Sequence, residues 1–450
     1  MTACDSCGVR VAVVVLAILS AACRSSALQP PQATPLPEPT PTAAPSPTPS
    51  ALAPIAVGAA PDAGVLLVAG EDDVIYRYDG VTGELRAVWR HADLTSATAD
   101  GAYFEGLEGG ITLVRWDGRA EPIECGPGKW GRLSAAGTCA SFAVGADRSL
   151  WVRDTPASVP RLVLPADWGL SDARWTSDAR SLVLLRSQAG TTPATRAHNA
   201  LWLMAPDGAL RRVYEPASPE SFLSGLRVSP EGQFALVSEM PIVSASVGAD
   251  GVELLLIELS SGTVSRLGKT LLSHSWTRWS DDGRLAFVRG GGRETWFGKQ
   301  LVVRERDGSL DVVAGDYATV ALAPAWRGVD LYWVQGQAGG NQDRSYVRGI
   351  GEGFRYGVHL SAAGRANLPF DGIVEGVRPS ADGRSALILA RRPTDQPGDQ
   401  YRQLELWLLR DIDGAAKATR LISNLGGLGF GYYGLQPSLF DLVAWSLDPR

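Results

Sequence analysis

The sequence predicts an all-β fold, a β-propeller of eight four-stranded blades, with seven blades as the alternative, closed by a C-terminal strand pair. Three observations predict it. Two kinds of hairpin recur in alternation from residue 55 onward, and a short copy lies near residue 450. In each kind, apolar strands flank a tight polar turn. Four strands in each unit of about 35 to 55 residues suit a propeller blade.

The first kind of hairpin occurs eight times. Its turn contains Gly or Asp-Gly, except in the third copy, where the turn contains Pro156 and Ser158. The copies occupy residues 75–89, 112–124, 150–164, 201–214, 255–267, 301–313, 358–369 and 406–422. Such turns join neighbouring antiparallel strands. Eight copies predict eight blades, and seven if the weak second or third unit merges with a neighbour.

The second kind of hairpin lies upstream of most copies of the first. Its clear copies are residues 174–185, 227–238, 278–288, 324–334 and 378–390, and its weaker copies are 97–106 and 134–144. Residues 436–446 form the short closing copy. We expect this copy to pair with the first blade, because that pairing removes the free sheet edges of an open ring.

Three copies carry a sharper turn motif, at residues 228–235, 279–287 and 379–387. They resemble the WD40-like (PD40) repeats of the TolB-type propellers, whose hallmark is a Trp-Ser-Pro-Asp-Gly-Arg turn followed by an apolar strand. The resemblance covers about residues 55–446 and implies the fold. Functions in that family range over envelope scaffolding, protein binding and the gating of peptidases. This chain has more repeats than is usual there, so the TolB role itself is not implied.

Residues 1–22 have the pattern of a signal peptide. Arg10 precedes an apolar run, residues 11–19, which is too short to span a bilayer comfortably. Small residues before Cys23 resemble a bacterial lipobox, although Ser20 stands where a larger apolar residue is usual. We therefore expect export and a lipid on Cys23, on the outer face of the bacterial cell membrane. The alternatives are an uncleaved anchor or a periplasmic or extracellular protein.

Residues 23–54 predict a disordered stalk, and residues 55–450 the propeller domain. The stalk is rich in Pro, Thr, Ser and Ala. Such a segment buries too little apolar surface to offset its ordering entropy, and its prolines favour extended polyproline II. At about 3.1 Å per residue, it would lift the domain several tens of Å from the lipid surface.

Two cysteines remain in the exported domain, Cys125 and Cys139, because Cys4 and Cys7 would leave with the signal and Cys23 would carry lipid. An oxidising compartment favours a disulfide between them, and two buried thiols are the alternative. The predicted stabilisation is about 3 kcal/mol. No metal site is expected, since these cysteines and four scattered histidines lack zinc-ligand spacing.

The net charge of −6 argues against nucleic acid as a partner. No cofactor is expected. Residues 429–434 match the spacing of a dinucleotide fingerprint, but strand-like residues and Pro437 follow where a helix is required. The partner is expected to be an envelope protein or an extracellular ligand, and membrane contact is expected through the lipid alone.

The most specific pattern is a column of arginines, Arg174, Arg227, Arg278 and Arg378, at one position of the second hairpin. Blade rotation would place these residues in a partial ring at the channel mouth, able to bind carboxylate or phosphate. In the structural alternative each arginine pairs with a turn acid and holds blades together. Those acids are Asp178, Glu231, Asp282 and Asp382.

No catalytic residue is assigned. The Gly-x-Ser-x-Gly elbow of serine hydrolases is missing from the sequence, and the histidines His91, His198, His274 and His359 share no spacing. Binding is therefore the function we expect from loops around a propeller channel. The alternatives are a propeller enzyme, a lyase or glycan hydrolase with acids at the channel, and a purely structural envelope protein.

Overall fold

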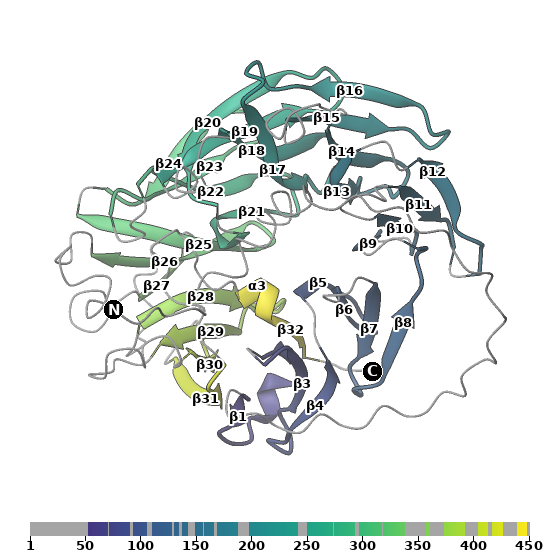
Figure 1. Cartoon of the computed structure of the whole chain (residues 1–450). Helices are drawn as coiled ribbons and strands as arrows, with labels where there is room; N and C mark the ends of the chain where they lie inside the picture. The colour runs from purple at the N-terminus through teal and green to yellow at the C-terminus, as the bar shows by residue number, and fades with distance from the viewer. Residues whose placement is uncertain are drawn as a thin grey trace, which may run out of the picture.

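The described strands of the computed structural model form a ring of antiparallel sheets (Figure 1). The described residues are 53–70, 72–90, 93–105, 110–127, 130–134, 137–142, 149–155, 157–165, 169–187, 198–241, 250–272, 274–292, 297–316, 318–337, 357–360, 373–391, 404–412, 416–425 and 439–447. The predicted signal and stalk, with Cys23, lie outside these residues. Among the helices described, none has the length and apolar character that a membrane span requires.

The sheets follow one another along the chain, and we number them as blades from the N-terminus. Blade 1 contains β32 (Val443–Ser446), β2 (Val65–Ala69), β3 (Val74–Asp79) and β4 (Leu85–Arg90). Blade 2 contains β5 (Asp93–Ala97), β6 (Gly101–Glu105), β7 (Ile111–Arg115) and β8 (Ala120–Ile123). Blade 3 contains β9 (Trp130–Leu133), β10 (Cys139–Phe142), β11 (Leu150–Arg153) and β12 (Arg161–Leu164). Blade 4 contains β13 (Gly169–Trp175), β14 (Leu182–Ser187), β15 (Asn199–Met204) and β16 (Leu210–Tyr214).

The second half of the ring continues the same order. Blade 5 contains β17 (Ser221–Val228), β18 (Phe234–Pro241), β19 (Val252–Glu258) and β20 (Val264–Thr270). Blade 6 contains β21 (Thr277–Trp279), β22 (Leu285–Arg289), β23 (Gln300–Arg304) and β24 (Leu310–Ala314). Blade 7 contains β25 (Thr319–Arg327), β26 (Asp330–Gln337) and β27 (Gly357–Leu360). Blade 8 contains β28 (Ile373–Pro379), β29 (Ser385–Arg391), β30 (Leu404–Arg410), β31 (Lys417–Ser423) and β1 (Ile55–Ala56).

The all-β propeller with four-stranded blades is confirmed. The described strands form eight sheets, of which seven have at least four strands and one, blade 7, has three. The seven sheets with at least four strands match the predicted alternative of seven blades, although the second and third units do not merge with a neighbour and each form a sheet of their own. The position of the three-stranded sheet in the ring is that of a blade, because its apolar residues pack against blade 6 on one side and against blade 8 on the other.

Both ends of the described chain meet at the joint between blades 8 and 1. β32 pairs with β2, with Trp445 opposite Leu66, so a C-terminal strand completes the first blade. This confirms the pairing of the closing copy with the first blade, but the described part of that copy contributes the short helix α3 (Leu439–Leu442) and one strand where a strand pair was predicted. A feature that the sequence did not predict is β1, which adds to the outer edge of β31 through the pair Ile55 and Ser423. The ring is thus closed on its inner side by one terminus and covered on its outer side by the other.

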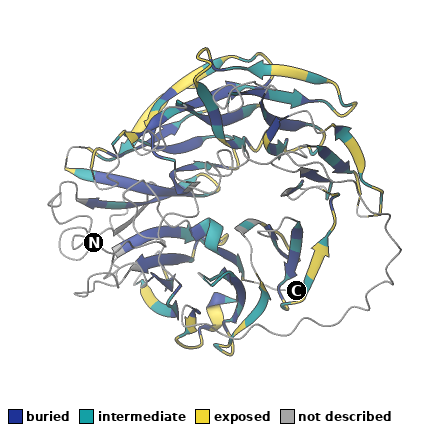
Figure 2. Ribbon diagram, viewed as in Figure 1, coloured by how far each residue is buried: buried dark blue, intermediate teal, exposed yellow. Residues whose placement is uncertain are grey.

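The core lies between blades, because the middle strands are buried on both faces. In β14, Leu182 and Leu184 pack toward blade 3, whereas Val183 and Leu185 pack toward blade 5. This two-sided burial explains why the middle strands are continuous apolar runs without the alternation of a half-buried strand. Figure 2 shows the exposed residues gathered on the outer strands, of which β16 and β8 are clear examples.

The turns of the second hairpin share one set of hydrogen bonds. Ser280 donates its hydroxyl hydrogen to Asp282 at 2.5 Å, and Ser380 does the same to Asp382 at 2.6 Å. The next residue adopts positive φ, which favours glycine, as at Gly283 (φ 85°). Blade 4 has Ala179 in that place, at φ 57°. Its Cβ lies too close to the backbone in this left-handed conformation.

Ala179→Gly is expected to raise the free energy of unfolding by about 1 kcal/mol, because glycine adopts the left-handed conformation without the Cβ contact. Urea denaturation measures the change. The matched control is Gly208→Ala, at a turn glycine with φ 85° and no atom within 4 Å of an added Cβ. It should lower stability by a similar amount. A less stable Ala179→Gly variant would contradict the account.

Cys125 and Cys139 form a disulfide between blades 2 and 3, and their Cα atoms lie 5.3 Å apart. Cys139 opens β10, and Cys125 follows β8. Both are buried and pack with Ile111 of β7. The bond therefore links two neighbouring blades across their apolar joint.

Replacing both cysteines with alanine is expected to lower the free energy of unfolding by about 3 kcal/mol, because the bond removes conformational entropy from the unfolded chain. Urea denaturation with and without dithiothreitol measures it. Reductant should destabilise the wild-type protein to a similar degree and leave the variant unchanged. A wild-type protein whose denaturation curve does not respond to complete reduction would refute the prediction.

Candidate functional site

The predicted arginine column lies on the inner strands of the blades. Arg174 is on β13, Arg227 on β17, Arg278 on β21 and Arg378 on β28. Their partners on the second strands are Val183, Leu236, Ala286 and Leu387, which hold the corresponding place in each blade. The repeated sequence thus places four guanidinium groups at equivalent positions of blades 4, 5, 6 and 8. These inner strands surround the centre of the ring (Figure 1).

A fifth member, Arg132 on β9, was missed in the sequence. It pairs with Ala140 on the second strand of blade 3, in the same register as the other four. The signal was present, since every member stands two residues before a turn hydroxyl, here Ser134. The turn of this copy has Ala136 where the other turns have Asp or Glu, which hid the match.

The column arginines donate to backbone carbonyls of the inner strands. Arg227 donates to Thr277 of blade 6 at 3.1 Å, and Arg378 donates to Val443 of blade 1 at 2.6 Å. A second link runs the other way, because the indole of Trp326 donates to the Arg278 carbonyl at 3.1 Å. The column therefore joins neighbouring blades through main-chain acceptors.

Three of the four turn acids, Asp178, Asp282 and Asp382, bind within their own turns and not to the column arginines as the structural alternative expected. Asp178 accepts hydrogen bonds from the Thr176 hydroxyl and from the Arg180 amide, both in its own turn. Asp282 and Asp382 likewise bind their own turns. The hydrogen bond from Thr176 lowers the pKa of Asp178. An Asp side chain is short and stands two residues after the turn hydroxyl. It therefore reaches the donors of its own turn more readily than it reaches an arginine on the inner strand.

In blades 2 to 4 the column is neutralised by two acids of the strands. Arg132 forms ion pairs with Glu105 and, at 3.4 Å, with Asp172. Asp172 also binds Arg174, at 2.8 Å. Burial raises the pKa of Glu105, and the charge of Arg132 opposes that effect. This chain of alternating charges connects three blades.

The other three members, which we call the central arginines (Arg227, Arg278 and Arg378), lie in a more positive environment. Burial, followed by the charge of Arg278, lowers the pKa of Arg227 to about 9. The same two causes lower the pKa of Arg378 to about 10. Asp441 opposes the effect at Arg227 and Arg278. The central arginines thus repel one another at close range in a partly desolvated place.

The short helix α3 (Leu439–Leu442) lies inside the ring, beside β28 and β32 (Figure 1). The guanidinium carbon of Arg278 is 4.1 Å from the centre of the Phe440 ring, and that of Arg378 is 5.3 Å from it. Both distances are within the range of cation–π attraction. Neither Phe440 nor Asp441 was predicted as a site residue, because residues 436–446 were interpreted as a strand pair.

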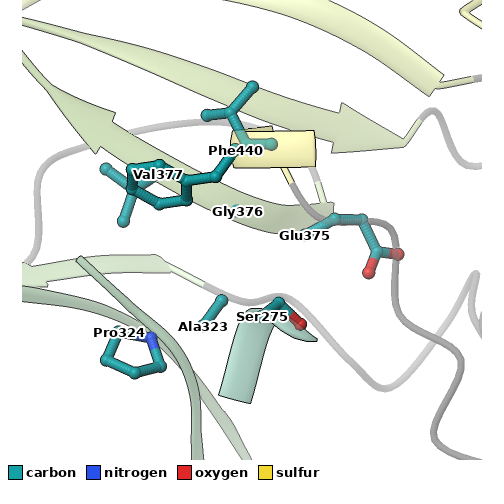
Figure 3. Close-up of a pocket in the computed structure, with 8 residues that line it drawn as sticks. Ser275, Ala323, Pro324, Glu375, Gly376, Val377 and Phe440 are labelled. Atoms are coloured by element: carbon teal, nitrogen blue, oxygen red, sulfur yellow. The ribbon is translucent and has the colours of Figure 1, made fainter. Parts of the chain in front are cut away.

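A small pocket adjoins α3. It is lined by Ser275, Ala323, Pro324, Glu375, Gly376, Val377, Leu439 and Phe440. In Figure 3, Glu375, Val377 and Phe440 lie on one side of it, and Ser275, Ala323 and Pro324 lie on the other. The lining is mainly apolar, and Glu375 is fully buried. Phe440 is thus shared by the pocket and by the contacts with Arg278 and Arg378.

The remaining predicted features are the histidines and the glycine-rich residues. His198 bonds the Ser221 carbonyl at 2.7 Å and the Glu215 carboxylate at 3.3 Å, which links blades 4 and 5. His91 and the glycine-rich residues 429–434 lie outside the described residues, as do the side chains of His274 and His359. Within the part of the chain that is described, no three His, Cys, Asp or Glu residues gather as metal ligands.

Comparisons with known proteins concern the fold. No family model matches the sequence, and no curated protein does. The chain is similar to TolB from Acinetobacter baumannii, with 16% identity over 75% of this chain and 80% of that one, at a TM-score of 0.29. The β-propeller domain of the Trilobed protease from Pyrococcus furiosus gives 14% identity, 76% and 97% coverage, and a TM-score of 0.38.

The tricorn protease gives 14% identity over 77% of this chain, at a TM-score of 0.40, and this chain spans 37% of its length. At these identities and TM-scores the likeness carries no statement about activity. The β-propeller assignment for this chain rests on its own strand pairing and on the apolar joints between its blades.

Proposed function

We propose that this chain is an exported, lipid-anchored β-propeller that binds an anionic ligand at the centre of its ring. One observation carries the proposal, the convergence of the central arginines around α3. Guanidinium groups bind carboxylate and phosphate with two parallel hydrogen bonds. The ligand is an envelope protein or an extracellular molecule that presents such a group.

The electrostatics of the central arginines support this proposal. Their lowered pKa values express the cost of holding like charges together in a place with little water. A bound anion would reverse that cost, whereas a neutral ligand would not. Arg227 and Arg378 each donate one hydrogen bond to a carbonyl of a neighbouring blade, and a guanidinium group has five N–H donors, so holding the blades together and binding an anion are compatible roles.

The enzyme alternative required several acids with raised pKa values at the channel. Burial raises the pKa of Glu105, but Arg132 holds this carboxylate in an ion pair between blades 2 and 3. That pairing favours a structural role for Glu105. We therefore propose binding and assign no catalytic residue.

Inorganic phosphate and citrate are expected to bind the full-length protein and to raise its melting temperature. At a ligand concentration one hundred times Kd, binding adds about 2.7 kcal/mol to the free energy of unfolding. Arg227→Gln and Arg278→Gln should each weaken citrate binding about tenfold or more, because each removes a charged donor. Isothermal titration measures the binding. Arg119→Gln is the matched control, since that side chain is 74% exposed on a turn, and it should bind as the wild type does.

The melting temperature separates the two roles of the arginines. Weaker citrate binding in a variant that melts like the wild type supports the binding site. Variants that melt at much lower temperatures and bind citrate as the wild type does would establish the structural role. A wild-type protein that binds neither anion would overturn the proposal.

The lipid anchor is proposed from the sequence alone, on the small residues that precede Cys23 and the apolar run before them. Cys23→Ser is expected to release the protein from the membrane fraction of cells, because no thiol remains for acylation. Fractionation and immunoblotting measure its distribution, and Ser25→Ala is a neighbouring control that should stay with the membrane. Retention of the Cys23→Ser protein at wild-type levels would contradict acylation there.

A further inference from the structure

Two side chains of α3 act on the central arginines, Phe440 by contact and Asp441 by its charge. The ring of Phe440 lies within cation–π range of Arg278 and Arg378, which come from blades 6 and 8. The neighbouring Asp441 offsets the charge of Arg227 and Arg278. An aromatic ring and a carboxylate thus meet these arginines from one helical turn.

Packing of α3 depends on another residue. Leu439 is 2% exposed and belongs to the apolar joint between blades 8 and 1. Phe440 and Asp441 are partly exposed. Leu439 therefore anchors α3 on one side, while Phe440 packs against the joint between blades 7 and 8 and also contacts Arg278 and Arg378.

We infer that the central site takes a ligand with an aromatic ring next to a carboxylate, and that Phe440 and Asp441 occupy its place until it binds. This inference rests on the proposed anion-binding function and adds the ligand class to it. The ring of the ligand replaces Phe440 between Arg278 and Arg378, and its carboxylate replaces that of Asp441. The same chemistry is offered by a small aryl carboxylic acid and by a peptide segment with Phe beside Asp.

Because Phe440 and Asp441 occupy the site, any ligand that competes for the same arginines binds more weakly. A tethered group acts at an effective concentration of roughly millimolar or above. The apparent affinity of a competing ligand falls by the fraction of molecules in which the site is open. Removing the ring of Phe440 and the charge of Asp441 should therefore tighten binding of the ligand. Removing a central arginine should abolish that binding.

The test uses the full-length protein and the variant Phe440→Ala/Asp441→Asn, which keeps Leu439. The probes are 3-phenylpropanoate and the capped peptide acetyl-Leu-Phe-Asp-Leu-amide, with the Asn form of the peptide as a control. Isothermal titration should show binding about tenfold tighter or more in the variant than in the wild type. Addition of Arg278→Gln to the variant should remove it.

A matched control variant makes the same chemical changes elsewhere. Phe297→Ala/Asp311→Asn alters two exposed residues of blade 6. Phe297 precedes β23, and Asp311 lies on the outer strand β24. It should bind both probes as the wild type does. Circular dichroism and melting temperature check that the α3 variant is folded, and Phe440→Leu with Asp441→Asn, which retains more apolar volume, replaces it if it is not.

The outcomes separate this inference from the proposed function. If phosphate and citrate bind the wild type but the aryl probes bind the open variant no more tightly, the inference is overturned and the anion site stands. If no anion binds either protein, both are overturned. Binding of 3-phenylpropanoate alone identifies a small-molecule ligand, and binding of the peptide alone identifies a protein partner, and both results support the inference.

Discussion

The whole ring depends on apolar packing between neighbouring blades. Each middle strand gives one set of side chains to the blade before it and the alternate set to the blade after it, as Leu184 and Val183 do in β14. The larger apolar clusters of the described residues span neighbouring blades, so each blade is stabilised mainly by its neighbours. This constraint makes closure of the ring essential, because an open end would expose a full apolar face to water.

The same repetition that builds the joints also gathers charge at the centre. A residue copied at the end of each inner strand returns at the same radius in every blade, and here that residue is arginine in five of them. The strands supply acids for the first two of these arginines, Arg132 and Arg174. The positive charge that remains lies around α3. A structural repeat thus produces a polar site as a consequence of its geometry.

Much of the fold was predictable because each repeat carries its own local signal. Alternating strands, glycine turns and the closing copy near residue 446 are short-range patterns. The column arginines were visible for the same reason. Arg132 was missed because its turn departs from the motif, although Ser134 keeps the spacing. The contacts of Phe440 with Arg278 and Arg378 were not predictable, because they join residues about 60 to 160 positions apart in the sequence. Local sequence patterns do not indicate such contacts. The strand β1 is too short for a pattern of its own.

The pairing of β32 with β2 has a consequence for the order of folding. Leu66 is among the first residues of the domain to be synthesised, and its partner Trp445 is among the last. Blade 1 therefore lacks its inner strand until residues 443–446 have been made and, if the protein is exported, translocated. During that interval the apolar faces of blades 8 and 1 have no permanent cover. Completion of the molecule is thus a single late event, and a chain interrupted before residue 443 cannot form the ring described here.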